Sequence, residues 1–360
     1  MDRVAQASHV ARGLAQAPRL ETRADGRARS LRVAIGDPQA PLDKMLTILD
    51  RHGLLGQDGR LEASVMLVSM GDHFDWGTTE EREQASQDGL ALFAWLASHP
   101  PDQVVMLAGN HDLGRVGELA SFDDDTFRSA HAEASRAYSH DDREAERELL
   151  RKYPALPTAE LAARDFATFS TAQRDVVLEA LRVGRLAAAH ALTGNTLLLH
   201  AGVTTDHASD DAFATAAKLN LALAVAARSY DGTPLRIPSL HEPGSAATGE
   251  GIGIFYHRPT SGPIEGRRFD PRKIPRGMTQ VIGHIGDEKC RELMPDWCTG
   301  EPANGALRSL VVDGGRVSYR PGVCDGDTRM VFTDGSMNRT DTGCYELLDL
   351  TRMGPLARPR

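Results

Sequence analysis

The stretch MLAGNHDLGR, residues 106–115, begins as an apolar run and ends in a polar cluster. Asn110 and His111 stand where a buried strand should end, and Gly109 before them permits a sharp turn. Four other apolar runs carry polar residues in the same way: LRVAIGD with Asp37, SVMLVSMGD with Asp72, NTLLLHAGV with His200 and TQVIGHIG with His284. Short aliphatic runs interrupted by Gly are typical of strands buried on both faces.

Helical stretches alternate with the first of these runs. Residues 41–55 open with Pro and carry apolar residues at helical spacing, and residues 81–100 show the same pattern and stop at a Pro. Alternating strands and helices indicate the α/β class. Ligands of such folds gather at the carboxyl ends of the strands, which is where the polar residues stand here. The sequence therefore predicts a site at this edge of the sheet.

Residues from about 115 to 192 are charged, Ala-rich and helical in pattern. They predict a helical insertion that caps a site, with an ordinary outer helical layer as the alternative. Residues 1–30 are predicted to be a loosely ordered tail, 31–352 the main domain, which includes this insertion, and 353–360 a second tail. The rest of the domain predicts a helix over 212–230, long loops over 241–277, a hairpin over 306–322 and strands within 329–338 and 343–350.

The composition limits the class of protein. The chain has 360 residues and a formal net charge of −9, which argues against a general nucleic-acid binder. It contains no apolar run of the ~20 residues that a membrane span needs and opens without the apolar segment of a secretory signal. The four cysteines, Cys290, Cys298, Cys324 and Cys344, show no C-x-x-C spacing. Reduced thiols in a cytoplasmic protein are therefore expected, and a disulfide in a secreted protein is the alternative.

The polar residues at the strand ends are of the types that bind divalent cations. Asp37 and Gln39 are two apart, so an extended segment projects them to the same face, and the run GDHFDWG adds Asp72 and Asp75. Together with Asn110 and the three histidines His111, His200 and His284, they offer oxygen and imidazole ligands suited to Mn, Fe or Zn, and also Mg. Each residue alone would pass for a turn former or a core histidine. Five apolar runs that carry such residues in this order favour a site for two metals.

The order G-D, G-D-x-x-D, G-N-H-D, H-A-G, G-H resembles the calcineurin-like metallophosphoesterases. The resemblance spans residues 31–286 and is greatest to the phosphoprotein-phosphatase branch with its bacterial Shewanella-like members. The element Gly117-Glu118-Leu119 and, more loosely, the segment TDGSMNRTDTGCYELLDL are similar to that branch. The resemblance implies an α/β fold with two packed mixed β-sheets flanked by helices, a four-layer sandwich.

The resemblance also implies a role for each position. Asp37 and Gln39 would bind the first metal, and Asp72 would bridge both. Asn110, His200 and His284 would bind the second. His111 would be the general acid, oriented by Asp75, while a metal-bound hydroxide attacks phosphorus. Two divalent ions are implied, with Mn first and Fe, Zn or Mg as alternatives.

Two positions depart from the family pattern. Gln39 stands where the family usually has His, and a neutral amide oxygen should bind the first metal more weakly. His73 is not expected to compensate, because neighbours on an extended segment point opposite ways. Trp76 stands where the phosphatase branch has the Arg that clamps phosphate. Arg115 is the expected substrate-binding replacement, with Arg228, Arg267 and Arg268 as alternatives.

The expected activity is that of a phosphomonoesterase, acting on a phosphorylated small molecule or a phosphoprotein. The absence of a second His after Gly283-His284 counts for this chemistry and against a nuclease. No nucleic-acid or membrane partner is expected. Two alternatives stay open: a dinucleoside polyphosphate hydrolase, and a non-catalytic module that binds a phosphorylated ligand with a degenerate first metal site.

Overall fold

The computed structural model describes residues 2–358. The helices are α1 Arg3–Gln16, α2 Leu42–Arg51, α3 Arg82–Ala97, α4 Asn110–Gly114, α5 Asp124–Ser139, α6 Arg143–Lys152, α7 Thr171–Arg182, α8 Ala212–Arg228 and α9 Asp287–Leu293. Short helical turns are η1 Leu161–Asp165, η2 Pro271–Lys273, η3 Pro295–Trp297 and η4 Met337–Arg339. The strands are β1 Leu31–Ile35, β2 Val65–Ser69, β3 Val104–Leu107, β4 Leu186–Ala187, β5 Ala189–Thr193, β6 Thr196–Leu199, β7 Arg258–Pro259, β8 Arg268–Phe269, β9 Thr279–Ile282, β10 Arg308–Asp313, β11 Arg316–Pro321, β12 Thr328–Phe332, β13 Leu348–Asp349 and β14 Gly354–Pro355.

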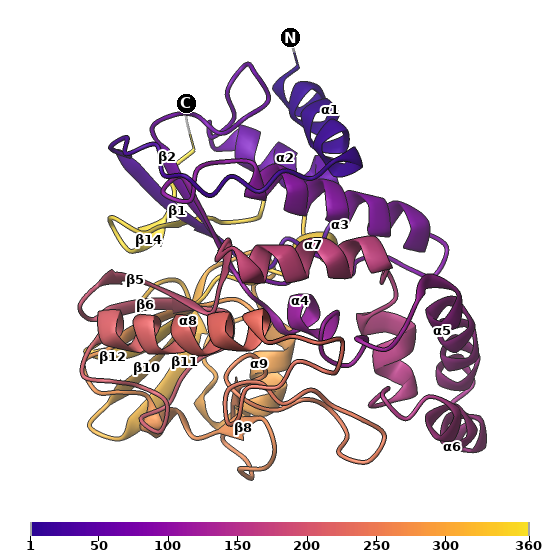
Figure 1. The fold of residues 1–360 in the computed structure, drawn as a ribbon. Helices are drawn as coiled ribbons and strands as arrows, with labels where there is room; N and C mark the ends of the chain where they lie inside the picture. The colour runs from indigo at the N-terminus through magenta and orange to yellow at the C-terminus, as the bar shows by residue number, and fades with distance from the viewer. Residues whose placement is uncertain (1, 359–360) are drawn as a thin grey trace.

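Two mixed six-stranded sheets form the centre of the molecule (Figure 1). The first has the order β14-β13-β1-β2-β3-β4, and the second β11-β10-β12-β9-β6-β5. In the first, β1 to β4 run parallel, and in the second, β6, β9 and β12 run parallel. The carboxyl ends of these strands therefore lie at one edge of each sheet.

Alternation of side chains along the strands produces the layers. One set of residues packs in the core between the sheets: Ala34, Val68, Leu107, Leu198, Val281 and Val331. Their strand neighbours belong to the larger cluster that also contains the helices: Val33, Leu67, Met106, Leu199, Ile282 and Phe332. Because successive residues of a strand point to opposite faces, apolar runs without alternation are buried on both sides. The expected sandwich of two mixed sheets flanked by helices is confirmed.

The N-terminal segment differs from the expected loosely ordered tail. Residues 3–16 form α1, capped by the Asp2 carboxylate, which accepts from the backbone N–H groups of Val4 and Ala5. The helix packs against α2 and α3 through the fully buried Ala7 and Ala11. Side chains this small let helix backbones approach closely, but they produce little hydrophobic signal, so the sequence pattern did not reveal the helix.

The predicted insertion is divided between two parts of the molecule. Helices α5 and α6 and the turn η1 enclose a small core of their own around Phe127 and Phe166, and α5 and α6 project to one side of the body (Figure 1). Helix α7 instead contributes Val176 and Val177 to the main core and packs against α3 and α8. The helical pattern expected up to residue 192 was wrong beyond α7, because Leu186–Ala187 and Ala189–Thr193 pair into the two sheets as β4 and β5. We call η1 with α5 and α6 the cap. No helix among residues 2–358 is both long and apolar enough to cross a membrane.

Candidate active site

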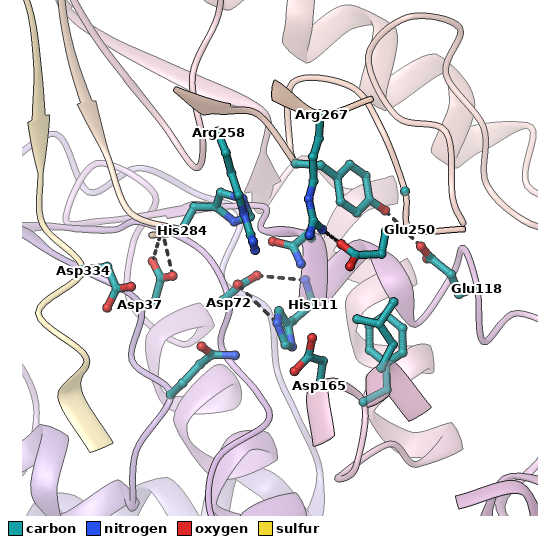
Figure 2. Close-up of a pocket in the computed structure, with 16 residues that line it drawn as sticks. Asp37, Asp72, His111, Glu118, Asp165, Glu250, Arg258, Arg267, His284 and Asp334 are labelled. Atoms are coloured by element: carbon teal, nitrogen blue, oxygen red, sulfur yellow. Dashed lines mark hydrogen bonds and ion pairs between the residues drawn. The ribbon is translucent and has the colours of Figure 1, made fainter. Parts of the chain in front are cut away.

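Five strands from the two sheets end at a common site. Asp37, Asp72 and Asn110 follow β1, β2 and β3 of the first sheet, and His200 and His284 follow β6 and β9 of the second. These residues come from segments that are far apart in the sequence. His284 and Asp37 are separated by 247 positions, yet the His284 amide donates hydrogen bonds to both Asp37 carboxylate oxygens, at 3.0 and 2.9 Å. Figure 2 shows Asp37, Asp72, His111 and His284 around the pocket.

The loops at these strand ends need unusual backbone conformations. Asp72, Asp75 and His284 have φ angles of 54°, 68° and 66°, in the left-handed region that costs a non-glycine residue of order 1 kcal/mol or more. The Asp112 carboxylate opposes this cost by accepting from the Asp72 amide at 3.1 Å and the Gly109 amide at 2.9 Å. A Cβ on Gly109 would collide with the Asp72 carboxylate, which is the physical reason for Gly at this position.

The His200 ring is held in an orientation that could bind a cation. Its Nδ1 donates to the Met70 carbonyl at 2.8 Å, so the Nε2 lone pair is the one that faces Asn110 and Asp72. This Nε2 lies 3.1 Å from Asn110 Oδ1 and 3.4 Å from Asp72 Oδ2. Three acceptors directed at one another repel unless a positive charge lies between them. The ligand atoms of Asp72, His200 and His284 all lie within 4.8 Å of one another, so the donor set fits a divalent cation.

The electrostatics of these residues agree with that fit. Burial would lower the pKa of His200, but Asp72 and Asp37 outweigh it and raise this pKa to about 9. The carboxylates that attract a proton here would attract a cation equally. Burial lowers the pKa of His284 well below its ordinary value, which keeps the ring neutral, as a ligand must be.

Asp37 and Gln39 lie on the other side of Asp72. The Gln39 Nε2 donates to the Phe74 carbonyl at 2.9 Å, which leaves Oε1 as the free acceptor. Asp37 is 4% exposed, and both residues line the pocket. The pKa of Asp37 is raised well above its ordinary value, first by burial and then by the Asp334 carboxylate. His73 is directed away, with Nδ1 3.0 Å from Asp112 and Nε2 3.0 Å from the Ser69 hydroxyl.

His111 stands beside Asp72, one of the residues that could hold a cation. Its Nδ1 lies 3.0 Å from Asp75 Oδ2, and its Nε2 lies 3.8 Å from Asp72 Oδ2. Burial would lower the pKa of His111, but Asp72 and Asp75 outweigh it and raise this pKa to about 10. The ring packs edge-on against Phe166 of the cap. His111 also lines the pocket.

Arg115 is not at the position expected of a substrate-binding residue. It is fully buried and does not line the pocket. Its guanidinium donates to both Asp75 oxygens, at 3.0 and 3.2 Å, and lies 4.1 Å from the centre of the Phe74 ring. Burial would raise the pKa of Asp75, but Arg115 and His111 outweigh it and hold this pKa at about 2. Arg115 therefore orients Asp75. It lies one helical turn after His111, and its side chain points back toward the loop after β2, which carries Asp75.

We expect Arg115→Met to lower the free energy of unfolding by about 3–5 kcal/mol, because it leaves the buried Asp75 carboxylate without its cation. Urea unfolding followed by circular dichroism measures this change. Arg128→Met is the matched control, since Arg128 forms an exposed ion pair with Asp125. A loss below about 1 kcal/mol for Arg115→Met would contradict the assignment.

Comparison with protein families identifies the chain. The model of the family described as calcineurin-like phosphoesterase matches residues 32–221. The chain belongs to this family. It is therefore a metal-dependent phosphoesterase, a hydrolase of phosphate esters. All four of its cysteines are free thiols.

Solved phosphatase structures are similar to this calcineurin-like phosphoesterase. A cold-active protein tyrosine phosphatase has 13% identity and a TM-score of 0.44, covering 91% of this chain and 76% of its own. A second structure, of the cold-active protein-tyrosine phosphatase of a psychrophile Shewanella sp., has 13% identity, coverages of 91% and 78% and a TM-score of 0.42. A Saccharomyces cerevisiae protein serine/threonine phosphatase with similarity to human phosphatase PP5 has 14% identity, coverages of 91% and 87% and a TM-score of 0.37. No curated protein matches the sequence significantly.

The remaining walls of the phosphoesterase pocket come from outside the motifs. The cap contributes Leu161, Asp165 and Phe166, and the loop before β7 contributes Glu250, Gly251 and Tyr256. Arg258 and Arg267 enter from the same side as this loop (Figure 2). Of these, only Arg267 was named from the sequence. The signal that could have found Arg258 is the Gly- and Pro-rich composition of the loop that carries it.

Glu118 explains the G-E-L element of the phosphoesterase. Its Oε1 accepts from the Gly244 amide at 2.9 Å and from the Tyr256 hydroxyl at 3.3 Å. Burial raises the pKa of this carboxyl. Glu118 thus fastens the loop that leads to Arg258 onto the segment that carries His111.

Proposed function

We propose that the protein is a phosphomonoesterase that works with two divalent cations. The first would lie between Asp37, Gln39 and Asp72. The second would lie between Asp72 and a set of three ligands: Asn110, His200 and His284. Such ions activate water and stabilise the charge on phosphoryl oxygens. The observation that carries this proposal is the His200 Nε2 lone pair facing the acceptor oxygens of Asp72 and Asn110 at 3.4 and 3.1 Å.

His111 is the proposed general acid. Because Asp75 accepts from Nδ1, the other ring nitrogen carries the proton that can be transferred to a leaving oxygen. Asp75 is held in turn by Arg115 and by the Thr168 hydroxyl, which donates to its Oδ1 at 2.6 Å. This packing fixes the direction of the imidazole before substrate arrives.

Trp76 stands where the phosphatase branch has its phosphate-binding Arg. Arg258 and Arg267 are the proposed phosphate-binding cations of this protein. Arg258 Nε donates to His284 Nε2 at 3.3 Å, and Arg267 pairs with Glu250. If His284 binds a metal through Nδ1, the neutral ring carries its proton on Nε2. This Nε2 can then no longer accept the hydrogen bond from Arg258. The guanidinium is then free for a phosphate oxygen.

The pocket consists of a small inner cavity that adjoins two wider ones. The inner cavity, of about 80 Å³, is comparable with the volume of a few water molecules, which is the scale of one phosphoryl group. An outer cavity of about 360 Å³, lined by Trp76, Arg164 and Arg339, shares Asp37, His111 and other residues with it. A third cavity, of about 320 Å³, shares Glu250, Gly251 and Arg267 with the inner one, so wider space adjoins the inner cavity along two walls. The preference for a monoester therefore rests on the absence of a second His after Gly283-His284.

The function is tested with purified protein supplied with Mn²⁺. Hydrolysis of an aryl phosphate and a phosphotyrosine peptide is compared with that of a bis-aryl phosphodiester and a dinucleoside tetraphosphate. We expect kcat/KM to be at least ten-fold higher for a monoester. Faster cleavage of the tetraphosphate would favour the dinucleoside polyphosphate hydrolase. A protein that binds fewer than two metals and hydrolyses none of these substrates would be a non-catalytic module.

We expect Arg258→Gln and Arg267→Gln each to raise KM for an aryl phosphate by about 10- to 100-fold, since each removes a charge-assisted hydrogen bond of ~1.5–3 kcal/mol. Inhibition by inorganic phosphate should weaken in parallel. Arg268→Gln is the matched control, because Arg268 is the exposed neighbour of Arg267 and does not line the inner cavity. Unchanged phosphate inhibition in both pocket variants would rule out their role as the phosphate clamp.

A further inference from the structure

A sixth strand ends at the pocket with Asp334, to which the sequence comparison assigned no role. Strands β9 and β12 are parallel neighbours, and Phe332 pairs with Ile282. His284 follows Ile282 by two residues, and Asp334 follows Phe332 by two. Asp334 therefore occupies on β12 the position that His284 occupies on β9, and it lines both the inner and the outer cavity.

The end of β12 is in direct contact with the end of β1. A Cβ on Gly36 would collide with the Thr333 carbonyl and lie 2.7 Å from the Asp334 amide nitrogen. Asp37, the residue after Gly36, is thus adjacent to Asp334, and Figure 2 shows the two carboxylates side by side. Gln39 lines the same two cavities.

The contacts of Asp334 hold its carboxylate and leave one oxygen free. Oδ1 accepts from the Ser336 amide at 2.8 Å, and the Asp334 carbonyl accepts from the buried Arg308 guanidinium. Within residues 2–358, Oδ2 has no hydrogen-bond partner. A half-buried carboxylate with a free oxygen beside a second carboxylate is unfavourable unless a proton or a cation neutralises the pair, and a divalent ion can do so for both at once.

Arg308 does not supply that cation in the pocket. Its side chain is fully buried behind the site and reaches only backbone oxygens, the carbonyls of Ile285 and Asp334. It can moderate the negative potential of the two carboxylates, but it does not bridge them. The pocket side of Asp37 and Asp334 is therefore where a positive charge is needed.

We propose that Asp334 is a further ligand of the first metal, so that this site is built from oxygen atoms alone, from Asp37, Gln39, Asp72 and Asp334. This inference rests on the proposed function. A fourth, anionic oxygen compensates for the neutral amide that Gln39 supplies in place of an imidazole. The first site then differs in kind from the second, which has two imidazoles, and it suits a hard ion such as Mn²⁺ or Mg²⁺.

The test is calorimetric titration of Mn²⁺ into the metal-free full chain, together with Mn²⁺ electron paramagnetic resonance. We expect the wild type to bind two equivalents and to show a magnetically coupled pair. Asp334→Asn should keep one equivalent, bind the other at least ten-fold more weakly and lose the coupled signal. An asparagine Oδ1 can still accept from the Ser336 amide, and thermal unfolding checks that the fold is kept. Asp334→Ser, which can also accept from that amide, replaces this variant if it is unstable.

Two further variants complete the experiment. Asp313→Asn, at the exposed end of β10, is the matched control and should bind both ions as the wild type does. Gln39→His in the Asp334→Asn background supplies an imidazole and should restore the second equivalent. If Asp334→Asn binds two Mn²⁺ ions with the same affinities as the wild type, the inference is overturned and the proposed function still stands. A wild type that binds fewer than two equivalents would instead overturn the dinuclear function itself.

Discussion

Replacing Asp72 with asparagine is expected to lower kcat/KM toward an aryl phosphate by at least a thousand-fold. Asp72 is the carboxylate shared by both proposed metal positions, so the substitution removes a negative charge from each. The change is conservative in shape. Asparagine tolerates the φ of 54° at this position, and its Oδ1 can still accept from the His111 amide, which donates at 2.9 Å. The loss should therefore come from metal binding and catalysis rather than from misfolding.

Asp141→Asn is the matched control for this variant. Asp141 also has a left-handed backbone, with a φ of 48°, but it is exposed between α5 and α6 of the cap. Steady-state kinetics with Mn²⁺ and metal analysis of both variants give the comparison. Wild-type activity with two bound metals in Asp72→Asn would end the assignment of Asp72 as a bridge.

Replacing His111 with alanine is expected to lower kcat about 10²- to 10⁴-fold for an alkyl phosphate, whose leaving oxygen needs a proton. The loss should be much smaller for a nitrophenyl phosphate, since that leaving group departs readily as an anion. The ratio of the two losses separates an acid from a residue that only supports the pocket. His140→Ala is the control, because His140 is exposed and contacts its own helix carbonyl at Arg136. Equal losses on both substrates would argue against a proton transfer from His111.

Asp75→Asn tests the same pair through its pH dependence. The Asp75 carboxylate raises the pKa of His111, so a neutral amide at this position should let that pKa fall. The protonated, cationic form of the His111 ring, which acts as the acid, is then lost at lower pH. The alkaline limb of kcat/KM should therefore move to lower pH by about one unit, the scale of a neighbouring opposite charge. A limb that stays in place would mean that His111 is not the group that titrates.

The strand ends could be predicted from sequence because their signals are local. Gly109 and Gly283 are needed where backbone and carboxylate approach closely, and each stands next to a residue of the pocket, Asn110 and His284. The aliphatic runs before them are the buried strands. This combination predicted the fold class, the family and the set of residues that the structure brings to one pocket. Their roles as ligands and acid remain proposals.

Other parts of the site lacked such signals. Arg115 follows the G-N-H-D motif and was expected at the substrate, but the turn of α4 directs it to Asp75. Arg258 is separated from its nearest motif residue, His284, by 26 positions, and only the loop fastened by Glu118 brings it to the pocket. Helix α1 was missed because its buried face consists of alanines.

The amino-acid sequence by itself determined the five buried strands that lead to the site, where each turns and which polar group follows it, because hydrophobic burial and the conformational freedom of glycine act on neighbouring residues. Only the tertiary structure decided which charges face one another. Asp75 with Arg115, and Asp37 with Asp334, meet because separate strands end at one edge, and electrostatic energy depends on distance in space rather than on separation along the chain.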